Sequence, residues 1–174
     1  FLSVLLAEIG EAPQLLLAVL AMRFADKRPL FIGLFLAAAF SAGLSSVAGF
    51  GLHGVMNAQA LTGFQALTLI TAGFGMLFWK RKVKTLSDWK SGALFTAFVG
   101  LAASQIGDKS QFLIAASAAR SGAIVVPAIA GFLAITLACV PAILFQERLG
   151  RILPINMIRW CGGAILTIAG LVLM

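Results

Sequence analysis

Long apolar stretches separated by short polar connections make up the pattern of the chain. An apolar run of about 20 residues is long enough for a helix to cross the hydrocarbon core of a bilayer. Six such stretches occur, at residues 2–22, 30–52, 61–79, 91–119, 123–145 and 155–174. Because the connections are short, we expect no soluble domain. The pattern predicts an all-α integral membrane protein with six transmembrane helices.

Composition supports the bilayer as the surroundings of these helices. The chain is 61% hydrophobic and 11% charged, with a mean hydropathy of +1.04, whereas soluble domains are about half apolar. Frequent glycine within apolar stretches is typical of membrane helices. We therefore expect lipid, rather than water, around most of the molecule.

The net charge of +7 is distributed in a way that indicates topology. Basic residues lie in alternate connections: Arg23, Lys27 and Arg28; Lys80, Arg81, Lys82, Lys84 and Lys90; Arg148, Arg151 and Arg159. The other connections carry only Arg120, a ratio of eleven to one. Basic connections remain in the cytoplasm, so this distribution predicts that both termini are periplasmic, in a bacterial inner membrane. It gives no reason to expect a nucleic-acid partner.

An internal repeat relates the two halves of the chain. The segment AEIGEAPQLLLAVLAMR, from Ala7, aligns without gaps on SQIGDKSQFLIAASAAR, from Ser104. Each unit holds three spans, and an odd number forces the second unit to be inverted in the membrane. Inverted repeats of this kind are the architecture of many secondary transporters. We expect one repeat at residues 1–79, a basic cytoplasmic linker at 80–90 and a second repeat at 91–174.

Acidic residues occur near the middle of the first and fourth spans, at Glu8, Glu11 and Asp108. An acid at the centre of a membrane helix costs about 2.5–3.5 kcal/mol on insertion scales. A buried structural network with Lys109 is one explanation, but three acids exceed what one lysine requires. The acids therefore predict a shared polar cavity.

Residues three positions apart share a helix face. Two polar stripes result, one of Glu8, Glu11 and Gln14, the other of Gln105, Asp108 and Gln111. Pro13 cannot donate a hydrogen bond to the carbonyl of Ile9, so we expect it to kink the first helix and free that carbonyl. Gly10 and Gly107 are further expected helix breaks, where a partner backbone can approach closely.

The segments EIGEAPQ and QIGDKSQ resemble the paired signature E-x-G-D-[KR]-[ST] of the GDT family of cation/proton exchangers. That family includes bacterial manganese exporters and Golgi calcium/manganese transporters. The resemblance covers essentially the whole chain, including the stretch ERLGRILP (Glu147–Pro154). It implies two three-helix units that exchange a divalent cation for protons, and a transporter rather than an enzyme.

Four positions depart from this signature, one of them Glu11 in place of the expected aspartate. Ala12 and Pro13 replace a basic and a hydroxyl residue in the first motif, and Gln105 replaces an acid in the second. A full motif pair carries four acids and two bases, a balance of minus two. Three acids and Lys109 also give minus two, the charge that a divalent cation neutralises.

The expected ligands of the transported cation all carry oxygen: Glu8, Glu11 and Asp108, the amides Gln14, Gln105 and Gln111, and Ser110. Lys109 is expected to balance charge. Oxygen ligands suit Mn2+ and Ca2+, and neither His53 nor the two cysteines Cys139 and Cys161 is expected near the motifs. We predict Mn2+ export first and Ca2+ export next, coupled to proton entry, with no resident cofactor.

Two alternatives remain open at this stage, a membrane scaffold that has lost transport and an exporter of another small substrate. A homo-oligomer is compatible with the pattern.

Overall fold

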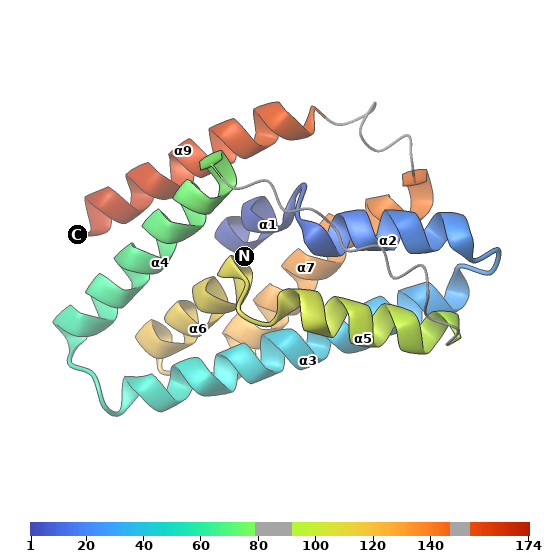
Figure 1. The fold of residues 1–174 in the computed structure, drawn as a ribbon. Helices are drawn as coiled ribbons and strands as arrows, with labels where there is room; N and C mark the ends of the chain where they lie inside the picture. Colours follow the sequence, from blue (N-terminus) through green and yellow to red (C-terminus); the bar gives the residue numbers. More distant parts are fainter. Residues whose placement is uncertain (79–91, 147–153) are drawn as a thin grey trace.

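A computed structural model describes residues 1–78, 92–146 and 154–174, and all regular structure in these ranges is helical (Figure 1). The helices are α1 (Leu2–Glu8), α2 (Ala12–Arg23), α3 (Arg28–His53), α4 (Ala58–Phe78), α5 (Ala93–Gln105), α6 (Lys109–Ser121), α7 (Val125–Phe145) and α9 (Ile155–Leu173). The predicted linker at 80–90, and most of the stretch from Glu147 to Pro154, lie outside the described residues.

Four of the described helices, α3, α4, α7 and α9, are each long and apolar enough to cross a membrane. The pair α1 and α2 passes the same test together and is bent by 55°, which gives up to five spans. The predicted fourth span at 91–119 is not one helix, because α5 ends at Gln105 and α6 begins at Lys109. The prediction of six spans is therefore met only in part.

Corresponding helices of the two halves begin a constant distance apart. The starts of α2, α3 and α4, at residues 12, 28 and 58, precede those of α6, α7 and α9, at 109, 125 and 155, by 97 positions. The same offset separates Ile9 from Ile106. In Figure 1 the pairs α1–α2 and α5–α6 each lie end to end, and the two pairs run in opposite directions.

Each broken helix pair packs against a long helix of the other half. The pair α1–α2 contacts α7, and the pair α5–α6 contacts α3. The two breaks therefore lie close together inside the bundle. Small buried residues such as Ala37, Ala38 and Ala134 allow this close packing.

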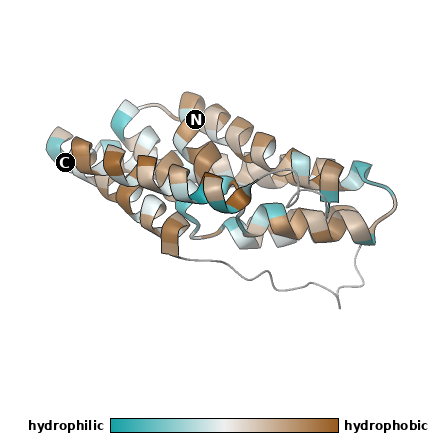
Figure 2. Cartoon of the chain, turned by 90° about the horizontal axis from the view of Figure 1, so that it is seen from above, coloured by the Kyte–Doolittle hydropathy of each residue, from teal (hydrophilic) through white to brown (hydrophobic). Residues whose placement is uncertain are grey.

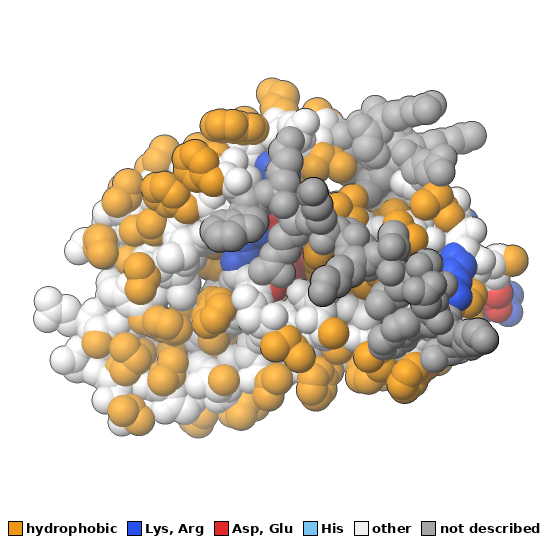
Figure 3. Space-filling model, viewed as in Figure 1, with side chains coloured by type: hydrophobic (Ala, Val, Ile, Leu, Met, Phe, Trp, Pro, Cys, Tyr) orange, Lys and Arg blue, Asp and Glu red, His pale blue; other side chains and the backbone are white. Residues whose placement is uncertain are grey.

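The outer surface is largely apolar. Large side chains such as Phe40, Leu133 and Val172 are exposed along the helices, and hydrophobic positions run along the helices in Figure 2 and over much of the face in Figure 3. A soluble protein of this size seldom exposes so much contiguous apolar surface. This surface suits contact with lipid.

Helices α4 and α9 pack against each other at backbone contact. A Cβ atom on Gly73 would lie 2.6 Å from the carbonyl oxygen of Gly163, and one on Gly170 would lie 2.7 Å from that of Ala66. These two contacts are equivalent, since Ala66 and Gly73 precede Gly163 and Gly170 by 97 positions. Small residues at such a crossing are typical of membrane helix pairs.

Candidate cation site at two helix breaks

A tight turn interrupts the first broken helix between Glu8 and Glu11. Ile9 has φ −69° and ψ 123°, Gly10 has φ +76°, and the N–H of Glu11 donates to the carbonyl of Glu8 over 3.3 Å. This is a type II turn, whose third residue needs a positive φ and is therefore glycine. The chain then re-enters a helix at Ala12.

The second broken helix contains the same turn. Ile106 has φ −60° and ψ 120°, Gly107 has φ +72°, and the N–H of Asp108 donates to the carbonyl of Gln105 over 2.9 Å. The expected break residues Gly10 and Gly107 thus occupy equivalent positions in the two turns. The glycine of the repeated motif is therefore explained by the backbone conformation of the turn, independently of the charge of the neighbouring acids.

Pro13 does not cause the first break. It lies in the first turn of α2, where a backbone N–H has no helical partner and proline is tolerated. The second turn has the same shape with Ser110 at the equivalent position. The turn at Gly10 takes the carbonyl of Ile9 out of the helix. The prediction that Pro13 causes the kink is therefore corrected.

A glutamine closes each turn. The N–H of Gly10 donates to Oε1 of Gln14 over 2.8 Å, and the N–H of Gly107 donates to Oε1 of Gln111 over 3.1 Å. The amide oxygens of Gln14 and Gln111, two of the three expected to bind a cation, thus each accept a backbone N–H in this structure. Their role as ligands stays a prediction that this geometry does not favour.

The same glutamines join the two halves of the molecule. Gln14 donates through Nε2 to the carbonyl of Ala138 on α7 over 2.7 Å, and Gln111 donates through Nε2 to Oγ of Ser41 on α3 over 2.9 Å. Ser41 and Ala138 are again 97 positions apart. Each turn is therefore fixed to the first long helix of the opposite half, α7 or α3.

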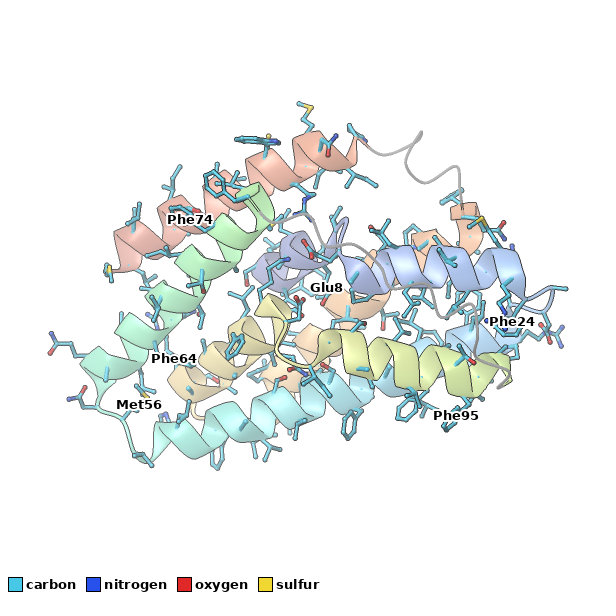
Figure 4. All side chains as sticks on the ribbon, in the orientation of Figure 1. Glu8, Phe24, Met56, Phe64, Phe74 and Phe95 are labelled. Atoms are coloured by element: carbon cyan, nitrogen blue, oxygen red, sulfur yellow. The ribbon has the colours of Figure 1, made fainter. Side chains whose placement is uncertain are left out.

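Glu8 and Gln105 are buried side chains at the ends of the two interrupted helices. Both are 0% exposed, and neither the two carboxylate oxygens of Glu8 nor the two amide atoms of Gln105 have a hydrogen-bond partner among the described residues. Figure 4 shows Glu8 where the broken helices meet. Buried polar groups are normally paired, so these four atoms are candidates to hold a polar or charged ligand.

Asp108 and Ser110 lie beside this group. The hydroxyl of Ser110 donates to Oδ2 of Asp108 over 3.2 Å, and both residues are buried. The carboxylate of Glu8 interacts electrostatically with those of Asp108 and Glu11. The structure therefore brings the three predicted acids together at the two breaks.

Glu11 is held by two basic side chains. Nζ of Lys109 lies 2.6 Å from Oε1 of Glu11, and Nη1 of Arg159 donates to the same oxygen. Arg159 also donates to the carbonyls of Gly10 and Met76, each over 3.1 Å. Lys109 thus pairs with an acid of the opposite turn, and its expected role in balancing charge stays a prediction.

Arg159 belongs to the site rather than to a basic connection. It lies in the second turn of α9 and is 5% exposed. Without it, the basic residues in alternate connections number ten against one, and the predicted topology is unchanged. The local charge also changes, because Glu8, Glu11 and Asp108 now face Lys109 and Arg159, a formal balance of minus one instead of minus two. The sequence signal was its position, five residues into an apolar stretch that begins at Ile155.

A cavity of about 620 Å³ leads to the site. It is lined by Glu11, Gly107, Asp108, Lys109 and Phe112, and by Phe64, Leu67, Thr68, Thr71 and Gly75 of α4. In Figure 3 acidic and basic side chains are visible near the middle of the molecule. Glu11 and Asp108 line the cavity, whereas Glu8 is fully buried and is not among the lining residues.

Soft ligands were expected away from the motifs, and this holds for His53 and Cys161 but not for Cys139. His53 contacts the carbonyl of Ala119 through Nδ1 over 2.7 Å, and Cys161 is exposed on α9. Cys139 is buried on α7, close enough to Glu8 for an electrostatic interaction. The described part of the chain contains no cluster of three or more His, Cys, Asp or Glu side chains arranged to hold a metal ion.

Comparison with known proteins gives a match to a family of transporters. A family model described as "Divalent cation/proton antiporter GDT1" matches residues 1–84 and 93–174. The two matched segments correspond to the two halves of the repeat. Neither a curated protein nor a solved structure matches the chain.

Proposed function

Since the chain belongs to the family of divalent cation/proton antiporters, we propose that it binds its cation where the two turns meet. The family consists of transporters rather than enzymes, and the apolar helices make the chain an integral membrane protein. The proposed ligands are the carboxylates of Glu8 and Asp108, the amide oxygen of Gln105 and the hydroxyl of Ser110.

The unpartnered oxygens of Glu8 are the observation that carries this proposal. A buried carboxylate without a partner is costly, and a bound cation or a proton removes that cost. Gln105 offers a further unpartnered oxygen at the equivalent position of the other half. Glu11 is occupied by Lys109 and Arg159, so it is a weaker ligand than the sequence suggested.

Proton exchange follows from the same carboxylates. Glu8 and Asp108 together carry two negative charges when ionised, and a divalent cation or two protons neutralise them. A buried low-dielectric site favours the neutralised forms, so cation release is coupled to protonation. Transport then moves a cation in one direction and protons in the other.

Mn2+ is the proposed cargo, with Ca2+ next. Carboxylate, amide and hydroxyl oxygens suit both ions. A thiol is a softer ligand than oxygen, and Cys139 lies near Glu8. This neighbour favours Mn2+ over Ca2+.

The proposed architecture is two inverted three-helix repeats, with α5 and α6 together as the sixth span. The constant offset of 97 positions, the matching turns and the crossed glutamine contacts support it. With basic connections in the cytoplasm, both termini are periplasmic in the proposed topology. The cavity then extends along α4 from Gly75 towards Phe64 and the outer side.

The test measures proton movement in vesicles that contain the protein and an internal pH reporter. Addition of Mn2+, Ca2+ or Mg2+ should drive proton flux, with Mn2+ the most effective. Glu8→Gln and Asp108→Asn should each abolish the flux. Asp26→Asn is a matched control, because Asp26 is an exposed loop acid that binds only the N–H of Arg28 among the contacts described.

Each other outcome has a distinct meaning. Cation entry without proton movement would show a decoupled carrier, with Gln105 the first residue to restore to glutamate. If no cation produces a flux in protein that shows a cooperative thermal unfolding transition and is therefore folded, transport would be contradicted and the scaffold favoured.

A further inference from the structure

Arg159 has no counterpart in the first half of the molecule. The position 97 residues earlier is Thr62 of α4, whose hydroxyl donates to the carbonyl of Ala58 in its own helix over 3.0 Å. The glutamine contacts to Ala138 and Ser41, by contrast, are equivalent in the two halves. The pairing of Arg159 with Glu11 therefore breaks the symmetry of the site.

The first turn also lacks a base of its own. Lys109 directly follows Asp108 in the second turn, whereas the equivalent position in the first is Ala12. Lys109 binds Glu11 of the opposite turn. The first turn has no such residue to offer in return, and Arg159 enters from α9 instead.

We infer that Arg159 supplies the missing second base of the site and thereby determines how tightly the cation binds. This inference rests on the proposed function. A positive charge paired with Glu11, whose carboxylate interacts electrostatically with that of Glu8, opposes a divalent cation. Arg159 changes the formal charge of the site from minus two to minus one. It therefore weakens the binding of the cation and permits its release.

Arg159 acts through charge and does not touch the cation. It lies on Glu11, Gly10 and Met76, whereas the proposed ligands are Glu8 and Asp108. The effect of its charge can be separated from that of its contacts, because Glu11 carries the opposite charge. Removing both side-chain charges restores the balance of minus one while the contact itself is lost.

The experiment measures the apparent KM for Mn2+ in a series of variants with defined net charge. The site balance is zero in Glu11→Gln, minus one in the wild type and in the double variant Glu11→Gln/Arg159→Gln, and minus two in Arg159→Gln. We expect Arg159→Gln to lower the KM by about tenfold or more and Glu11→Gln to raise it by a similar factor. The double variant and Arg159→Lys should return to within about threefold of the wild type.

Two further measurements keep the inference separate from loss of folding and from failure of transport. Stabilisation of the purified variants by Mn2+ in thermal unfolding gives the binding midpoint without any flux, and it should follow the same order. Arg28→Gln, which removes an exposed charge at the start of α3, should leave both readouts unchanged.

An unchanged or raised KM in folded Arg159→Gln would overturn the inference while leaving the proposed function intact. The same holds if the KM of the double variant departs from that of the wild type as far as the KM of either single variant does, since that outcome marks the ion pair as purely structural. If no divalent cation drives proton movement by the wild type, and Mn2+ does not stabilise it, the proposed function itself is contradicted.

Discussion

Gly10 and Gly107 have the same backbone conformation in different surroundings. Both have positive φ, as the third residue of a type II turn requires. A Cβ atom on Gly10 would lie 2.5 Å from Cγ2 of Ile155 and 3.2 Å from Cδ of Arg159. At Gly107 no atom of the described residues beyond its chain neighbours would lie within 4 Å. Alanine at Gly107 therefore meets only the conformational cost, whereas alanine at Gly10 also meets a clash.

We expect Gly107→Ala to destabilise the protein by about 1–2 kcal/mol, the cost of a left-handed conformation with a side chain. Gly10→Ala should cost clearly more, because α9 must move. The free energy of unfolding in detergent, measured with both variants, checks this order. Gly51→Ala, in open space on α3, should cost nothing, and equal losses at Gly10 and Gly107 would contradict the packing difference.

At the scale of single residues the sequence was informative about acids and less so about their partners. Glu8, Glu11 and Asp108 were visible because an acid in an apolar stretch has few explanations. Arg159 was not assigned to the site, since it also completes the pattern of basic connections. Only a tertiary contact from α9 to the first turn distinguishes the two roles.

The next scale is that of the elements, where α4 and α9 form a closely packed pair. Their glycines bring backbone atoms of the two helices together at Gly73 and Gly163 and again at Ala66 and Gly170. The pair contacts the rest of the bundle through α6 and α1, and Arg159 joins it to the first turn.

Gly73→Ala should separate α4 from α9, because a Cβ atom there has no room beside the carbonyl of Gly163. We expect a loss of about 1–3 kcal/mol, the usual cost of overpacking, in the free energy of unfolding. Gly63→Ala is the control in the same helix, since nothing lies within 4 Å of its Cβ position. A loss as large at Gly63 would point to the helix itself rather than to the interface.

The glutamines show what periodicity leaves undecided. Gln14 and Gln111 follow Glu11 and Asp108 by three positions, which suits one face of a continuous helix and equally suits a residue that caps a new helix. The sequence therefore predicted the polar stripes but not the turns within them. The apolar stretch at residues 91–119 was predicted to be one span for the same reason, because apolar residues continue on both sides of Gly107.

We expect Gln111→Leu to destabilise the second turn by about 1–3 kcal/mol, because it removes two hydrogen bonds, from the N–H of Gly107 and to Oγ of Ser41. Gln111→Glu should retain the bond from the N–H of Gly107 and lose only the donation to Ser41. Hydrogen exchange at the amide of Gly107 measures this directly, and it should rise in the leucine variant alone. Equal exchange in both variants would show that the bond to Ser41 holds the turn.

At the scale of the whole molecule, residues of both halves line the cavity beside the site. The cavity lies between α4 and α6, beside the second turn, where Ile106 and Gly107 are exposed. The equivalent first turn is covered by Ile155 and Arg159 of α9. The structure is therefore symmetric in its elements and asymmetric in the surroundings of its two turns.

A cysteine at Thr71, which lines the cavity, should react with a hydrophilic thiol reagent added from the outer side, in a chain with Cys139 and Cys161 replaced by alanine. Mn2+ should slow this reaction, because a bound cation closes access to the site. A cysteine at Leu137, a lipid-facing position on α7 that is 57% exposed, should not react. Reaction at Thr71 that is indifferent to Mn2+ would separate the cavity from the cation route.

The lining of the cavity has a consequence for hydration. Thr68 and Thr71 line it from α4, whereas the residues 97 positions later on α9 are Ile165 and Ile168. If the two halves exchange their surroundings during transport, the route that opens towards the cytoplasm is lined by isoleucines. A cation then leaves most of its water before it reaches Glu8 from the inside and regains water beside the threonines on the way out.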